Sequence, residues 1–232
     1  MDSSNLTPKR ITVFAGHYGS GKTNIAVNYA LYLAKDNSKV AIADLDIVNP
    51  YFRTKDSAKV LENVGINLIS SPYANTNVDT PALPAEIYSL FAQPDAKGVI
   101  DVGGDDRGAL ALGRYADLIL EENDYEFLFV INKFRYLTGD AASCVEVMHE
   151  IETAANMKFT AIVNNSNLGE ETTADTVMSS LSFADEVSSL TGLPIKMTTV
   201  KSDLFPNLTD KINNLMPIDL YVRQSWLRKE EL

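Results

Sequence analysis

The residues with the clearest chemistry form one short stretch near the N-terminus. They match the pattern G-x-x-x-x-G-K-[ST] and read Gly16, His17, Tyr18, Gly19, Ser20, Gly21, Lys22 and Thr23. Glycines in this pattern let backbone N–H groups curl around phosphate oxygens. We expect Lys22 to reach the β- and γ-phosphates of a nucleoside triphosphate and the Thr23 hydroxyl to ligate Mg²⁺. The positive end of the following helix, including Asn24, extends the predicted phosphate site.

Asp101 is the first acidic candidate, because it lies at the end of the apolar run 98–102 and begins the sequence Asp-Val-Gly-Gly. A carboxylate at this point can hold Mg²⁺ through water. The N–H of Gly104 could then reach the γ-phosphate, as in loops that sense a nucleotide. The alternative is a turn-forming aspartate with two glycines.

Asp44 and Asp46 close a second apolar run, 39–43. Two residues apart on an extended chain, their side chains would point the same way. One could orient the attacking water and the other could support Mg²⁺ or Lys22. We expect Asp46 to be catalytic and to contribute to the metal site, while a cap or turn role is the alternative for both aspartates.

Two asparagine-containing segments bear on the identity of the base. Residues 132–135, Asn-Lys-Phe-Arg, partly match the guanine-binding motif N-K-x-D. However, Arg135 stands at the position of the aspartate that would accept hydrogen bonds from guanine. This argues against GTP. Asn164 and Asn165 are better placed to read an adenine edge, because an amide both donates and accepts hydrogen bonds. Ordinary loop chemistry is their alternative role.

The composition narrows the class of protein. The formal charge is −11 and the pI is about 4.6, with no basic stripe, so we expect no nucleic-acid partner. No apolar run is long enough for a membrane span, and the N-terminus lacks a secretory signal, so we expect no integral membrane contact. The single cysteine, Cys144, favours a reduced, cytoplasmic setting and is predicted to be a partly buried helix residue.

Short apolar runs alternate with amphipathic stretches, as in βαβ units. We predict an α/β fold, a single three-layer domain with a mostly parallel sheet of about seven strands, a core over about 10–200 and a C-terminal tail over about 213–232. The predicted strands are 11–15, 39–43, 66–69, 98–102, 126–132, 158–164 and 195–200. The predicted helices are 22–35, 85–92, 109–121, 139–155 and 173–190, and 71–84 reads as a loop.

The polar motifs follow five of these strands. Ligands gather at the carboxyl ends of parallel strands, so we expect the motifs to share one site.

Together the motifs resemble the MinD/ParA class of P-loop ATPases, which also contains the CobQ/CobB-type nucleotide-binding domain. The resemblance spans about residues 10–200 and rests on GHYGSGKT at 16–23, ADLDIVNP at 43–50, DVGGDD at 101–106 and IVNN at 162–165. It implies that Asp46 positions water, Asp101 serves the magnesium site and Asn164 contacts adenine. It also implies an ATP-dependent homodimer with both nucleotides near the interface.

One position departs from the family pattern. Many members carry a second lysine directly after the first glycine of the loop, and it crosses to the other subunit's nucleotide. This chain has His17 there. A neutral imidazole cannot replace a fixed cation, which places trans-activated hydrolysis in doubt. His17 could contact the nucleotide or the second subunit.

Three functions fit these residues. The expected one is a slow Mg²⁺-dependent ATPase that acts as a nucleotide-dependent switch on a partner protein. The second is an ATP-dependent ligase or kinase acting on a small anionic substrate, with 71–84 as a pocket wall. Tyr51, Arg53 and Arg107 are candidates to bind that substrate, and the role we favour for them is structural or in a dimer contact. The third is a module that binds nucleotide without hydrolysing it.

Overall fold

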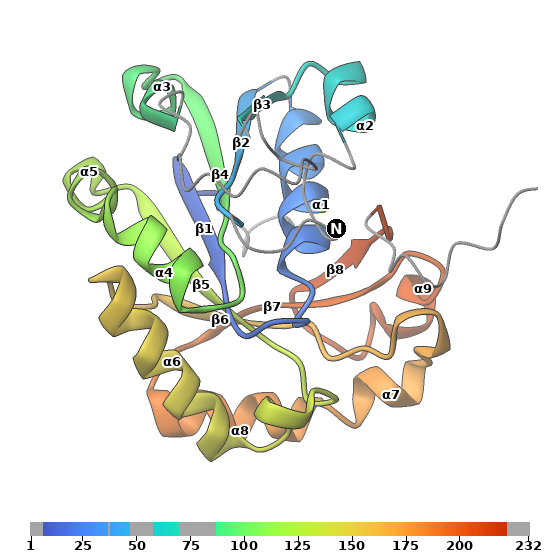
Figure 1. Ribbon diagram of the computed structural model, residues 1–232. Coiled ribbons are helices and arrows are strands. Elements are labelled where there is room, and N and C mark those ends of the chain that lie inside the picture. The colour runs from blue at the N-terminus through green and yellow to red at the C-terminus, as the bar shows by residue number, and fades with distance from the viewer. Residues whose placement is uncertain (1–6, 37, 47–57, 70–86, 222–232) are drawn as a thin grey trace, which may run out of the picture.

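The computed structural model describes residues 7–36, 38–46, 58–69 and 87–221. A sheet of eight parallel strands runs through them in the order β3-β2-β4-β1-β5-β6-β7-β8 (Figure 1). The strands are β1 (Ile11–Ala15), β2 (Lys39–Asp44), β3 (Asn67–Ile69), β4 (Ala96–Asp101), β5 (Tyr125–Ile131), β6 (Ala161–Asn164), β7 (Ile195–Lys201) and β8 (Leu215–Ile218). The predicted fold class is confirmed, with one strand more than expected: β8 lies within the segment predicted as a tail and pairs with β7.

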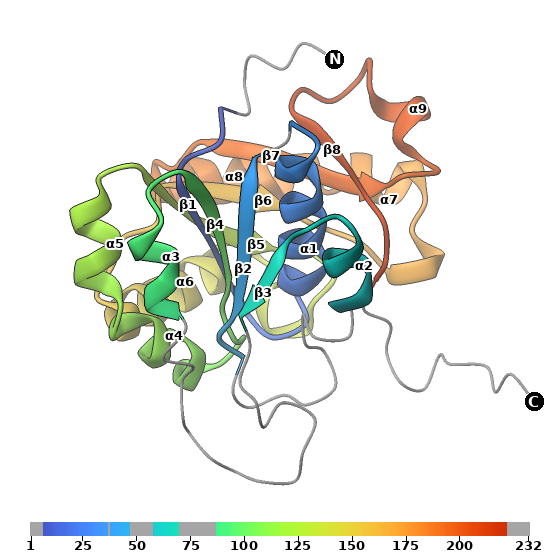
Figure 2. The same ribbon diagram turned by 90° about the horizontal axis from the view of Figure 1, so that it is seen from above.

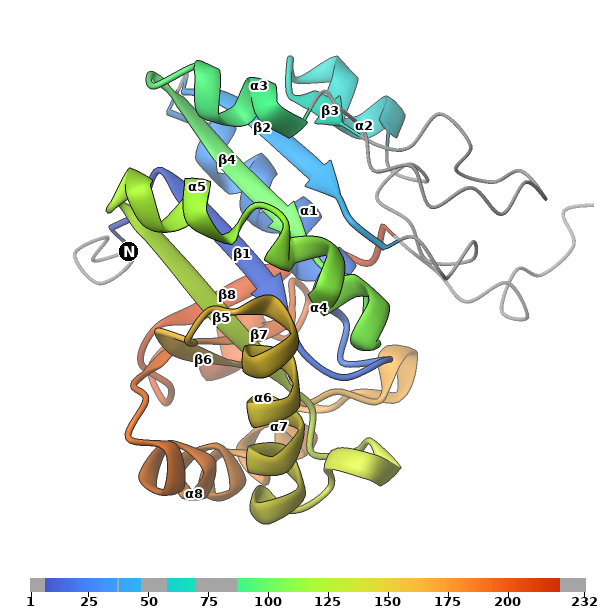
Figure 3. The ribbon, with the colours of Figure 1, turned by 60° about the vertical axis from the view of Figure 1, so that its left-hand side comes forward.

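Helices cover both faces of the sheet. The helices are α1 (Lys22–Ala34), α2 (Ala58–Asn63), α3 (Tyr88–Ala92), α4 (Asp106–Gly113), α5 (Ala116–Glu122), α6 (Ala141–Ala155), α7 (Ala174–Met178), α8 (Leu181–Thr191) and α9 (Phe205–Leu208), with 3₁₀ turns η4 (Tyr136–Thr138) and η5 (Gly169–Glu171). Figures 2 and 3 show α1 and α2 on one face of the sheet and α3, α4, α5 and α6 on the other. The result is a three-layer arrangement.

The strand sequences account for the two cores. In β1, Ile11 and Val13 belong to the cluster under α4, α6 and α8, whereas Phe14 points to the cluster under α1. A strand that is buried on both faces needs apolar side chains in both alternating sets. This is why β1 and β5 read as nearly continuous apolar runs.

Two predicted helices are each divided. The helix predicted over 109–121 is α4 followed by α5, and the break carries bonds of the i→i−3 type from Arg114 N to Ala111 O and from Tyr115 N to Leu112 O. The helix predicted over 173–190 is α7 followed by α8. At that break the Ser180 hydroxyl donates to Val177 O at 2.7 Å, a local bond that competes with regular helix.

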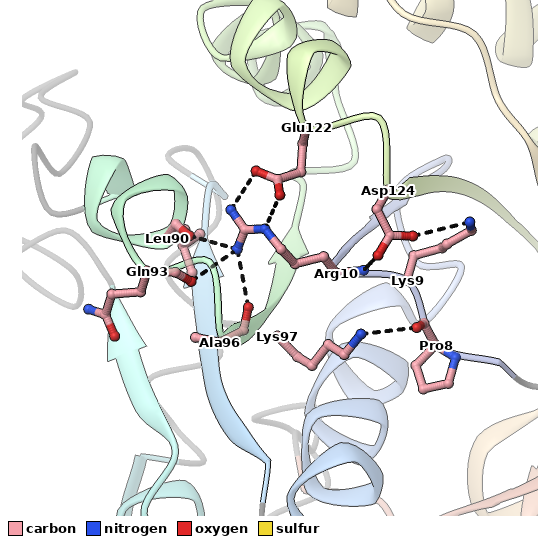
Figure 4. Close-up of polar contacts among 9 residues, drawn as sticks. All are labelled: Pro8, Lys9, Arg10, Leu90, Gln93, Ala96, Lys97, Glu122 and Asp124. Carbon is pink, nitrogen blue, oxygen red and sulfur yellow. Dashed lines mark hydrogen bonds and ion pairs between the residues drawn. The ribbon is translucent and has the colours of Figure 1, made fainter.

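Arg10 fixes the amino-terminal edge of the sheet, away from the strand ends that carry the polar motifs (Figure 4). Its buried guanidinium pairs with Glu122 at the end of α5. It also donates to the carbonyls of Leu90 (3.0 Å), Gln93 (3.3 Å) and Ala96 (3.1 Å). These bonds tie α3, α5 and the start of β4 to β1, so they hold in place the strands whose other ends build the candidate site.

Candidate functional site

The loop 16–21 connects β1 directly to α1, the context that the phosphate-binding pattern requires. Gly19 and Gly21 have φ of +76° and +89°, a conformation that a residue with a Cβ adopts only with strain. A side chain at Gly21 would also collide with the Asn165 amide. Within the loop, Ser20 N donates to His17 O at 3.1 Å. Helix α1 begins at Lys22, directly after the loop, so its positive amino-terminal end is suited to an anion.

Lys22 is buried beside the loop, with only 7% of its surface exposed. Its Nζ donates to His17 O at 3.1 Å. Burial lowers the pKa of Lys22, and the opposing charges of Asp101, Asp46 and then Asp105 partly offset this effect by favouring the ammonium form. The structure therefore holds a poorly solvated cation where a phosphate would restore its lost solvation.

The aspartates at the ends of β2 and β4 lie on neighbouring strands. Asp44 is opposite Asp101 in the parallel register, and both are buried. Asp46 N donates to Asp44 Oδ1 at 2.9 Å. Strand β2 ends at Asp44, so Asp46 lies just beyond the strand. Asp46 lies beside the loop after β4, because a Cβ on Gly103 would be 3.3 Å from Asp46 Oδ1.

Gly104 brings the loop after β4 onto the phosphate loop. A Cβ on Gly104 would lie 2.6 Å from Tyr18 Cα, 2.8 Å from Tyr18 N and 2.9 Å from Lys22 Nζ. Only a residue without a side chain allows this approach. The predicted neighbours Lys22, Gly104 and Asp46 are thus brought together at one edge of the sheet.

Oxygen donors suited to magnesium lie at this edge. Thr23 is in the first turn of α1, and Asp101 pairs in register with Phe14 at the end of β1. A hydroxyl and a carboxylate are hard ligands, and Mg²⁺ is commonly completed by nucleotide phosphates and water. The donor set therefore fits Mg²⁺ bound together with a nucleotide.

Asn164 and Asn165 lie beneath the loop, with their amides bonded to protein atoms. Asn164 Nδ2 donates to Ser180 Oγ at 3.0 Å, and Asn164 Oδ1 accepts from Ser166. Asn165 Nδ2 donates to Ser20 O at 2.6 Å, and its Oδ1 accepts from Thr199 Oγ1 at 2.5 Å. In this structure the Asn165 side chain supports the phosphate loop, whereas the Asn164 side chain holds Ser166 and Ser180. Contact with adenine stays a prediction that would require these bonds to rearrange.

Other predicted residues have different surroundings. The Asn24 side-chain oxygen accepts from Tyr221 N at 3.0 Å, so it also anchors the segment after β8. Arg107 is exposed in the first turn of α4. Tyr51, Arg53 and the loop 71–84 lie outside the described residues. Cys144 is buried in α6 as predicted, and burial raises the pKa of its thiol to about 12.

One residue near the loop was not predicted as a site residue. Arg135 was noted only for replacing a carboxylate, yet its Nε lies 3.3 Å from the position of a Cβ on Gly19. Sequence spacing does not reveal this contact, because it depends on how the loop after β5 folds back over the loop after β1. The available signal was a basic residue three positions after Asn132, in a loop that follows a buried strand.

None of the described helices is both long enough and apolar enough to cross a membrane. A family model described as the CobQ/CobB/MinD/ParA nucleotide binding domain matches residues 11–192. A search of curated protein sequences gave no match.

Solved structures share the fold at low identity. Cell division protein FtsY from Thermotoga maritima is 20% identical with a TM-score of 0.55, over 93% of this chain and 67% of that one. FtsY from Mycoplasma mycoides is 20% identical with a TM-score of 0.55, over 83% of this chain and 60% of its own length. The signal recognition particle 54 kDa protein from Aeropyrum pernix, in complex with GDP, is 18% identical with a TM-score of 0.53. The match covers 85% of this chain and 43% of that one.

Proposed function

Because the chain belongs to the CobQ/CobB/MinD/ParA nucleotide-binding domain family, we propose that it is a slow Mg²⁺-dependent ATPase acting as a nucleotide-dependent switch. The observation that carries the proposal is the approach of Gly104 to Tyr18 and Lys22. A loop that touches both the phosphate loop and its lysine is positioned to change when a γ-phosphate is present or absent. Such γ-phosphate contacts drive known nucleotide switches.

The proposed reaction is in-line attack of water on the γ-phosphorus. A new P–O bond forms to the water oxygen as the bond to the β,γ-bridging oxygen breaks, releasing ADP and phosphate. Lys22 and the N–H groups of the loop stabilise the charge that develops on the phosphate oxygens. Asp46, beside Gly103, orients the water. Mg²⁺, held by Thr23 and Asp101 with the phosphates, supplies further charge neutralisation when bound.

The loop after β5 supports ATP rather than GTP. A guanine-reading loop needs a carboxylate three residues after the asparagine, where it accepts from the guanine N–H groups. Arg135 occupies the carboxylate position. We propose Asn164 and Asn165 as the adenine contacts.

We further propose that the ATP form is a homodimer that engages a partner protein in the cytoplasm. Exposed apolar side chains support this interface, because they surround the carboxyl ends of the strands where the phosphate loop lies: Tyr18, Tyr136, Leu137 and Leu168. His17 is near them, with its Nδ1 3.0 Å from Tyr18 O. A second subunit would cover this rim and exclude water from the site.

Phosphate release and molecular mass, measured together with Mg²⁺ and either ATP or GTP, test the switch proposal. We expect slow release from ATP, slower release from GTP, and a doubling of mass with ATP but not with ADP. Tight ATP binding with neither release nor dimerisation would contradict the proposal. That outcome would favour a ligase, a kinase or a binding-only module, and faster release from GTP would overturn the base assignment.

A further inference from the structure

Arg135 places a guanidinium against the phosphate loop from a different part of the chain. Measured from the position of a Cβ on Gly19, its Nε, Cζ and Cδ lie at 3.3, 3.5 and 3.6 Å. Gly19 lies in the left-handed region, so the loop has no side chain of its own there. The guanidinium therefore packs beside the backbone of the phosphate loop at Gly19.

The backbone that carries Arg135 is held firmly. Arg135 N donates to Asn132 O at 3.2 Å, and Asn132 is fully buried. Lys133 N donates to Ser166 Oγ at 3.0 Å, and Lys133 Nζ donates to Ser179 O at 2.8 Å. These bonds connect the loop after β5 to the segments after β6 and α7. The position of Arg135 is thus determined by the fold rather than by a flexible connection.

The charge of Arg135 is not used elsewhere among the described residues. No carboxylate of those residues lies within ion-pair distance of it, and its buried Nε has no hydrogen-bond partner among them. A buried guanidinium N–H without an acceptor is unfavourable, and arginine is suited to bidentate contact with phosphate. The missing acceptor and the adjacent phosphate loop both indicate a phosphate oxygen as the ligand.

We propose that Arg135 contacts a phosphate oxygen of the bound nucleotide and supplies, within the same subunit, a fixed cation at this loop. The proposal rests on the proposed function, because it needs a nucleotide at residues 16–23. Arg135 forms and breaks no covalent bond in the reaction. It stabilises negative charge on the phosphates, as a guanidinium does in other phosphoryl-transfer sites.

Binding of ATP, ADP and AMP to the Arg135→Gln protein tests the proposal. Loss of one charge-assisted phosphate contact should weaken ATP and ADP binding by roughly 10- to 100-fold. We expect the binding of AMP, which lacks the β- and γ-phosphates, to change less. Arg135→Lys should restore part of the lost affinity, because lysine retains the positive charge but not the two parallel N–H donors of the guanidinium. Arg114→Gln is the matched control, since Arg114 is exposed at the end of α4.

The outcomes separate the two proposals. If the unmodified protein binds no nucleotide, the proposed function fails. If it binds ATP and Arg135→Gln binds ATP equally well, the role of Arg135 alone is overturned. An unchanged melting temperature of the ligand-free variant is expected, and equal weakening of all three nucleotides together with a lowered melting temperature would show a structural role instead.

Discussion

Replacing Lys22 with alanine should reduce ATP turnover by roughly 100- to 1,000-fold, the range seen when a group that stabilises transition-state charge is removed. Lys22 is the cation buried within the loop, and burial has already lowered its pKa. In the proposed site its charge would interact with phosphate in a poorly solvated setting, where a lost contact has a large effect. Phosphate release under saturating ATP measures the change.

Lys158→Ala is the matched control for this variant. Lys158 pairs with Glu152, but its own side chain is 82% exposed and it belongs to neither the phosphate loop nor the loop after β4, so removing it should change turnover little. Turnover by the Lys22→Ala protein at the level of the Lys158→Ala protein would remove Lys22 from the mechanism. Circular dichroism on both variants checks that the fold is intact.

Gly104→Ala is expected to have the second largest effect. The added methyl group would lie 2.6 Å from Tyr18 Cα and 2.8 Å from Tyr18 N, so one loop must move away from the other. Overpacking of this kind costs roughly 1–3 kcal/mol, which corresponds to roughly a 5- to 150-fold change in an equilibrium constant. We expect turnover to fall within that range and the affinity for ATP to fall more than that for ADP.

Gly65→Ala is the control for Gly104→Ala, because it replaces a glycine with alanine where no contact with another loop is lost. Gly65 has φ of +77°, and a Cβ there would meet nothing within 4 Å. Gly65→Ala should therefore cost only backbone strain of roughly 1–2 kcal/mol and leave turnover unchanged. If Gly104→Ala also retained full turnover and the usual preference for ATP, the loop after β4 would not be the element that responds to the γ-phosphate.

Local signals predicted the elements that position the site. The apolar runs that became β1, β2, β4 and β5 are buried on both faces, and residues 16–23 carry the glycines that the turn into α1 requires. The strand β8 was missed, because Leu215–Ile218 is short and contains a proline. Its place in the sheet depends on pairing with β7 rather than on its own pattern.

The parts of the site that sequence could not supply are contacts between separate loops. Asn165 was predicted to face adenine, and the structure shows its amide bonded to Ser20 O and Thr199 Oγ1. Arg135 was interpreted through the residue it replaces, whereas its position beside Gly19 follows from the folding of two loops. Such contacts are set by tertiary geometry, so residue type and spacing alone do not determine them.

The most direct test of the central claim, that residues 16–23 hold the phosphates of a nucleotide, is backbone hydrogen exchange with and without Mg²⁺ and a non-hydrolysable ATP analogue. Bound phosphate oxygens would accept from the loop N–H groups, so exchange should slow in a peptide covering 16–23. It should also slow around Gly104. Unchanged exchange in both segments at saturating analogue, or protection confined to the amino-terminal edge around Arg10, would contradict the account.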